Sequence, residues 1–231
     1  MTLILRLLLP FALPVVLLAA GCAIDPIRAN DHGELFAHGR VEAELGPGRH
    51  DPGVRPFRHS VEVGLTGVDG RTATNDFEVG IERYRMVEAS AAWKPTWQVG
   101  PSVSLSGLVG LAYEDFSFDF DSSLAAGGPQ PLGANGPTYD DRALAGMLGV
   151  EVRAGLPAAG VYGRTTQASS GRATSGIIEV GVELRPHPSF AVQVAYRWWK
   201  LEALDISGAP AALDDVDLRV DGLTVGGVLR F

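Results

Sequence analysis

The chain has 231 residues, of which 46% are hydrophobic and 20% charged, and a formal net charge of -8. This composition excludes an intrinsically disordered chain, and the acidic balance argues against nucleic-acid binding. The single cysteine excludes an internal disulfide and any multi-cysteine metal site. The length fits one domain.

Residues 1–21 predict an export signal. Arg6 is the only charge before an apolar run, Leu7 to Ala20, which is short for a membrane-spanning helix and ends in small residues. The stretch LLAAGC, ending at Cys22, resembles the lipobox of bacterial lipoproteins. The resemblance implies cleavage before Cys22, a diacylglycerol on its thiol and, since no aspartate follows, delivery to the outer membrane by the lipoprotein-transport machinery. Ordinary signal-peptidase cleavage nearby is the alternative.

After a linker at 22–32, residues 33–231 predict β-strands, because hydrophobic residues recur with a period of two. Val61, Val63 and Leu65, for example, alternate with smaller or charged neighbours. Strands are expected at 35–45, 58–68, 84–93, 99–116, 142–156, 160–168, 174–185, 189–202 and 218–231. No run of about eighteen apolar residues occurs after the signal, so any protein segment that crosses a membrane must be a strand.

Three features favour a membrane barrel over a soluble β-sandwich. The polar strand faces are rich in glycine, alanine and serine, which suits a narrow lumen. Aromatic residues gather near strand ends, as in the interfacial girdles of membrane barrels, although a core position is the alternative. These girdle residues are Trp93, Trp97, Tyr113, Phe190, Tyr196 and Trp198. Tight turns at 94–97, 156–160 and 185–188 oppose long polar loops at 116–141 and 203–217, an asymmetry typical of outer-membrane barrels.

The last strand alternates up to the final phenylalanine and resembles the targeting signal of bacterial outer-membrane proteins. Leu229 and Phe231 would be read by the barrel-assembly machinery. The whole mature pattern resembles small OmpA/OmpX-type or opacity-type barrels. The resemblance implies an all-β, closed, antiparallel up-and-down transmembrane barrel, surrounded by outer-membrane lipids and lipopolysaccharide, with a periplasmic N-terminus. The lipobox is a departure, since most such barrels are not lipidated.

The predicted strands number nine, whereas bacterial single-chain barrels have an even number. A turn near Glu82–Tyr84 would give ten strands, with Asp69-Gly70 as a tight hairpin turn. It would also keep Arg83 and Arg85 from facing lipid, where a charge near mid-membrane costs about 2–4 kcal/mol. Leaving 35–45 outside the barrel would give eight. We favour ten.

The predicted lumenal face carries charges of both signs. They are Arg40, Glu42, Glu44, Glu62, Glu88, Glu151, Arg153, Glu179, Glu183, Arg185 and Arg197, with Gln193 beside them. In so narrow a barrel, side chains fill the interior, and a buried charge requires a partner. We expect an internal ion-pair network that plugs the barrel; a polar path for small cations is the alternative.

No residue is predicted to be catalytic. His59 and Ser60 are adjacent and so point to opposite faces of a strand, and no phosphate-loop, dinucleotide or metalloprotease motif occurs. The aspartates of the two long loops lack calcium-loop spacing, so neither metal nor cofactor is expected.

We expect a structural or surface-interaction role through the loops, with an unidentified partner. A narrow pore or carrier is the first alternative, and a lipid-modifying or proteolytic barrel enzyme the second. The third is a soluble periplasmic ligand-binding β-domain, which would place Glu151, Glu179 and Glu183 in water.

Overall fold

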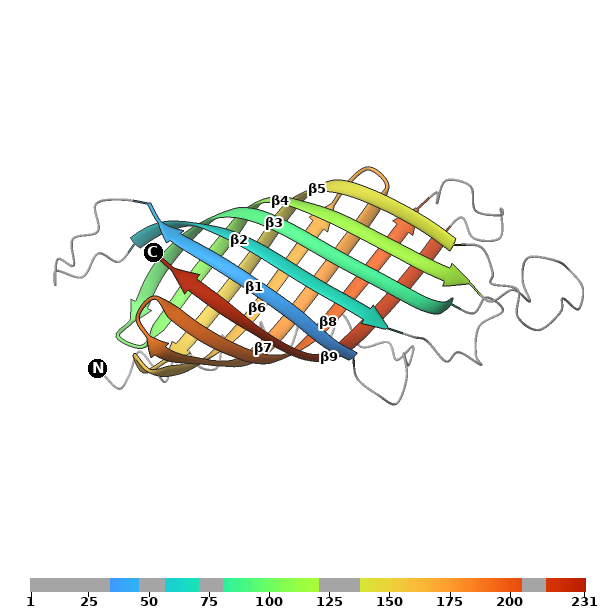
Figure 1. Ribbon diagram of the computed structural model, residues 1–231. Coiled ribbons are helices and arrows are strands. Elements are labelled where there is room, and N and C mark those ends of the chain that lie inside the picture. Colours follow the sequence, from blue (N-terminus) through green and yellow to red (C-terminus); the bar gives the residue numbers. More distant parts are fainter. Residues whose placement is uncertain (1–33, 46–56, 71–80, 121–137, 205–214) are drawn as a thin grey trace, which may run out of the picture.

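The computed structural model describes residues 34–45, 57–70, 81–120, 138–204 and 215–231. These residues form a closed barrel in which each strand pairs with the next one along the chain, which confirms the expected all-β closed barrel (Figure 1). The strands are β1 (Glu34–Glu44), β2 (Phe57–Gly70), β3 (Ile81–Gly100), β4 (Val103–Phe120), β5 (Thr138–Gly155), β6 (Ala159–Ser169), β7 (Ala173–His187), β8 (Phe190–Leu204) and β9 (Asp215–Arg230). No helix among the described residues is long and apolar enough to span a bilayer.

The barrel closes through a parallel pair. Strand β1 runs parallel to β9, with Ala37 opposite Val225 and Val41 opposite Leu229, while every other pair is antiparallel. The expectations of ten strands and of a fully antiparallel sheet are therefore wrong. With an odd number of alternating strands the first and last run in the same direction, so a parallel ladder joins them, and such a ladder is only slightly less stable per residue than an antiparallel one.

The turn expected near Glu82–Tyr84 does not exist, because β3 is continuous through this region. Arg83 points outward but is not an isolated charge: its Nη2 lies 2.8 Å from Oδ2 of Asp69 on the neighbouring strand. Asp69 and Gly70 belong to β2 instead of forming a hairpin turn. The connection that follows, 71–80, lies outside the described residues.

The tight turn expected at 94–97 is also absent. Strand β3 continues past Pro95 to a turn at Pro101 and Ser102. Pro95 lacks the N–H that donates to a neighbouring strand. The β4 residue beside Pro95 is Gly107, and a Cβ added to Gly107 would lie 3.5 Å from the proline ring. Because the strand continues, Lys94 faces the interior of the barrel, where it is 2% exposed.

The two ends of the barrel differ. At the short-turn end lie the turns after β3, β5 and β7, Phe231, and the strand ends that residues 46–56 connect. At the loop end lie the short turn 170–172 and the strand ends that residues 71–80, 121–137 and 205–214 connect. These four connections are outside the described residues. Strand β1 starts at the loop end (Figure 1). Part of each expected long loop is strand, since β4 extends to Phe120 and β9 begins at Asp215.

Candidate functional site

The outer surface of the barrel is an apolar belt. Alternation places one side chain of every two outward, and most of these are large and hydrophobic. Exposed members of the apolar belt include Val41, Val63, Leu65, Val109, Leu111, Leu144, Leu148, Val150, Val161, Val180, Val182, Leu184, Leu223, Val225 and Leu229. Leu148 is 64% exposed, a value typical of a surface position rather than of a core.

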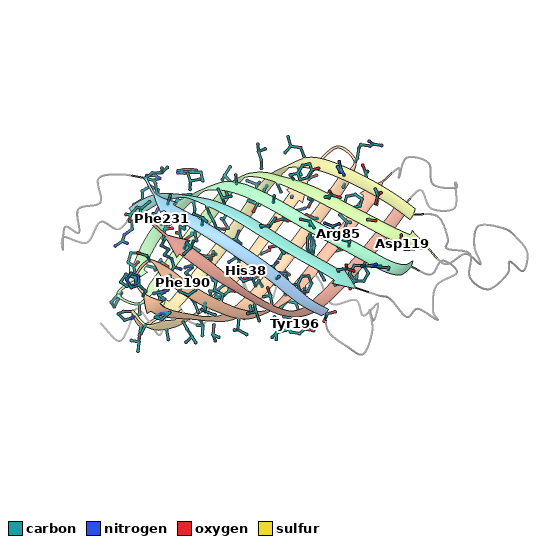
Figure 2. All side chains as sticks on the ribbon, viewed as in Figure 1. His38, Arg85, Asp119, Phe190, Tyr196 and Phe231 are labelled. Carbon is teal, nitrogen blue, oxygen red and sulfur yellow. The ribbon has the colours of Figure 1, made fainter. Side chains whose placement is uncertain are left out.

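Charged residues end the apolar belt toward the loop end. Going up β4, the outward residue after Tyr113 is Asp115, which lies 3.4 Å from Arg142 of β5. On β8 the outward residue after Trp198 is Lys200, which pairs with Glu202. Figure 2 shows Arg85 and Asp119 at this end and Phe190 and Phe231 at the other. We call this set of outward charges the polar collar; its members are Asp69, Arg83, Arg85, Asp115, Asp119, Asp140, Arg142, Lys200, Glu202 and Asp221.

The residues expected to form an aromatic girdle all point outward and are between 37% and 44% exposed. Trp97 and Phe190 lie toward the short-turn end, near the first or last residues of their strands. Tyr113, Tyr196 and Trp198 lie at the edge of the polar collar, where the Tyr196 hydroxyl donates to Asp221. Trp93 stacks on His59 of β2 at 5.5 Å between ring centroids.

The interior toward the short-turn end is filled by ion pairs, and Lys94 is the centre of one group. Its Nζ lies 2.8 Å from Glu151, 3.1 Å from Glu62 and 3.6 Å from Glu42. Arg164 on β6 also pairs with Glu62, and its Nη1 is 3.5 Å from Glu151. These residues come from five different strands, so the group ties opposite walls of the barrel together.

Glu179 is the centre of a second group. Its carboxylate accepts from Arg40 at 2.9 Å, from Arg197 Nε at 2.8 Å and from the Tyr162 hydroxyl at 2.6 Å. Gln193 joins this group to its surroundings, because its Oε1 accepts from Arg40 at 3.1 Å and lies 3.0 Å from the His38 ring. Glu179 itself is fully buried.

Glu183 links both groups to the short-turn end. It pairs with Arg153 at 3.1 Å, with Arg185 at 2.5 Å and with Arg230 at 2.8 Å, and it accepts a hydrogen bond from Gln193. Since burying a charge is unfavourable unless it is paired, this connectivity explains how so many charges fit inside a narrow barrel.

The interior toward the loop end is apolar. Its inward residues are Phe36, Val68, Tyr84, Met86, Phe116, Ile177, Trp199, Leu201 and Val220, each no more than 6% exposed. The Phe36 ring lies 6.3 Å from that of Trp199, and the Arg197 guanidinium sits over Phe36 at 5.6 Å. Arg197 thus marks the boundary between the charged and apolar halves. The barrel is charged inside where its surface is apolar, and apolar inside where its surface is charged.

Most of the charges expected in the lumen belong to this network. The exceptions are Glu44, which is exposed at the end of β1, and Glu88, which is buried but forms no ion pair with the described residues. The network also contains four residues that the sequence analysis did not place in the lumen: Lys94, Tyr162, Arg164 and Arg230. Lys94 falls within 94–97, which the sequence predicts to be a turn. Tyr162 and Arg164 lie on the inward face of β6 and Arg230 lies on that of β9, as the alternation of those strands in the sequence indicates.

The C-terminal residues are held by β1. The Phe231 N–H donates to the Glu42 carbonyl at 3.0 Å, and the Phe231 carbonyl accepts from Glu44 at 3.0 Å. Both Phe231 and Leu229 point outward, and the Phe231 side chain is 77% exposed. The last residue is therefore fixed in the sheet, with its ring available on the surface.

Nothing in the described part of the chain resembles a metal centre built from three or more histidine, cysteine, aspartate or glutamate side chains. Cys22 lies outside the described residues, as do His32 and His50. Comparison of the chain with protein-family models, with curated proteins and with solved structures gives no match.

Proposed function

We propose that this protein is a closed outer-membrane β-barrel with a structural or surface-interaction role. One observation carries the proposal: the surface of the barrel is apolar and its interior is charged. Contiguous exposed apolar surface of this extent is unfavourable in water and marks contact with a membrane or a partner. Because exposed hydrophobic side chains occur on all nine strands, with Trp93 on β3 and Phe190 on β8 among them, a lipid bilayer fits this surface better than a protein bound on one side.

The polar collar supports a position for the barrel in the membrane. Its charges would lie among lipid headgroups or in water at the loop end, with Tyr113, Tyr196 and Trp198 at the interface below. The loop end would face the cell exterior and Phe231 the periplasm, in line with the targeting signal that the last strand resembles. Lipopolysaccharide would then surround the collar, and the barrel-assembly machinery would insert the chain.

The interior supports a plugged barrel rather than a pore. Lys94, Glu151 and Glu179 are at most 2% exposed and are held by partners from opposite walls. Contact with other molecules would then fall to the connections at the loop end, within 116–141 and 203–217. Attachment of a lipid at Cys22 completes the proposal.

Electrophoresis without boiling tests the membrane barrel. The Cys22→Ala variant, exported through an exchanged signal peptide, should stay in the outer-membrane fraction and shift in mobility on heating, because folded membrane barrels resist the detergent. Release of this variant into the soluble fraction, with no heat-dependent shift, would refute an integral barrel.

Planar-bilayer recordings test the plug. The purified wild-type barrel should give no regular conductance steps, whereas Lys94→Ala combined with Arg164→Ala should give them, since both cations leave the centre of the network. Regular cation-selective steps from the wild-type protein would favour the pore instead.

A further inference from the structure

Two glutamates inside the barrel stand apart from the ion-pair network. Glu88 on β3 and Glu114 on β4 are direct partners in the register of these strands, so their side chains lie next to each other on the inward face. Glu88 is 7% exposed and Glu114 is 2% exposed. They lie at the boundary of the apolar half, one inward step from Met86 and Phe116 respectively.

Neither carboxylate has a cationic partner. Ser175 of β7 donates to Glu114 Oε1 across the barrel, but the buried Oε2 of Glu114 has no hydrogen-bond partner. Glu88 makes no hydrogen bond or ion pair with any residue that the structure describes. The arginines whose charges act on Glu88, namely Arg40, Arg164 and Arg197, are bonded to Glu62 or Glu179.

The inward carboxylates of the charged half differ from this pair. Glu42, Glu62, Glu151, Glu179 and Glu183 each pair with at least one arginine or lysine. A buried, unpaired carboxylate is strongly unfavourable, and two neighbouring ones repel each other in addition. A positive charge between them would remove both penalties.

We propose that Glu88, Glu114 and the Ser175 hydroxyl form a binding site for one divalent cation inside the barrel. The two carboxylates together carry the charge that one divalent ion neutralises. Oxygen atoms are the hard donors that Ca²⁺ selects, and carboxylates can bind this ion through one oxygen or both; water would supply the rest of the roughly six to eight oxygens that Ca²⁺ takes. The unpartnered Oε2 of Glu114 supplies a free ligand atom. The ion would link β3 and β4 to β7 at a level of the barrel where the ion-pair network of the charged half makes no such link.

Metal content and stability test the site in the full chain, folded in detergent micelles with Ca²⁺ and then dialysed into metal-free buffer. The wild-type protein should retain stoichiometric Ca²⁺ by mass spectrometry, and the Glu88→Gln/Glu114→Gln variant should retain none. Glu202→Gln, which removes a carboxylate from the polar collar, is the matched control and should retain the ion. Folding in EDTA should lower the unfolding temperature of the wild-type protein by several degrees and leave that of the double variant unchanged.

Two results would overturn the proposal. One is a wild-type unfolding temperature that is the same with Ca²⁺, Mg²⁺ or EDTA. The other is wild-type protein free of metal and stabilised as the pH falls, an effect absent from Glu114→Gln, because the pair would then hold a proton in place of an ion.

Discussion

Replacement of Lys94 by methionine should destabilise the barrel more than any other single loss of a cation. Methionine nearly matches the length of the lysine side chain, so the substitution removes the charge and leaves the volume almost unchanged. The ammonium group lies within 3.6 Å of three carboxylates and the residue is 2% exposed, so water cannot replace it. Glu62 and Glu151 keep arginine partners, but the three carboxylates around Lys94 then share one cation fewer.

The expected loss is about 3–5 kcal/mol of unfolding free energy, as for other buried pairs broken on one side. Urea titration of the detergent-folded protein, followed by tryptophan fluorescence, measures it. Arg142→Met is the matched control: its 3.4 Å pair with Asp115 is exposed on both sides, and such pairs contribute at most about 1 kcal/mol.

A second substitution separates charge from packing. Adding Glu151→Gln to Lys94→Met removes a negative charge that has lost one of its partners, so the double variant should recover part of the lost stability. Equal losses for Lys94→Met and Arg142→Met, or a double variant less stable than Lys94→Met alone, would refute this account of the network.

Three other substitutions test the surface, the packing and the C-terminus. Val109→Arg, in the middle of the apolar belt, should cost about 2–4 kcal/mol in lipid vesicles, whereas Ser117→Arg in the collar region should be neutral; equal effects would contradict a lipid-facing belt. Gly110→Ala should cost about 1–3 kcal/mol by urea titration, because the added Cβ would lie 2.0 Å from the Ala91 carbonyl oxygen. Gly146→Ala, with open space around it, should not. Phe231→Ala should reduce the amount of barrel in the outer membrane of cells without slowing refolding in detergent; unchanged amounts in cells would remove its role as an assembly signal.

The period of two predicts which way each side chain points, because a strand has only two faces. Val63, Leu65 and Leu223 lie outward, and Glu62, Glu151 and Glu179 inward, as their alternation indicates. The boundaries of strands were harder to predict. A proline at position 95 predicts a turn. Only the pairing of β3 with β4 shows that the strand continues and that Gly107 lies beside Pro95.

The number of strands was predicted incorrectly for a related reason. An isolated outward Arg83 is unfavourable in lipid and so predicts a turn, but its partner Asp69 comes from a strand whose register the sequence does not reveal. Single strands do show the change between an apolar and a charged interior. On the inward face of β1, Phe36 is followed by His38 and Arg40. That neighbouring strands reach this change side by side, with Glu179 opposite Arg197 and Ile177 opposite Trp199, is shown only by the register.

The parallel pairing of β1 with β9 has a consequence for the membrane anchor. An even-stranded barrel returns its two termini to one side of the bilayer, whereas here the first strand begins at the end opposite Phe231. If Phe231 faces the periplasm, β1 begins on the outer side, at Glu34. The linker from Cys22 to Glu34 spans at most about 43 Å when fully stretched, which is about the thickness of a bilayer with its headgroups. Under the proposed function, a lipid on Cys22 would reach the inner leaflet only if this linker crossed the whole bilayer fully extended. The expected place of the anchor is therefore the outer leaflet, in place of the periplasmic N-terminus that the sequence resemblance implies.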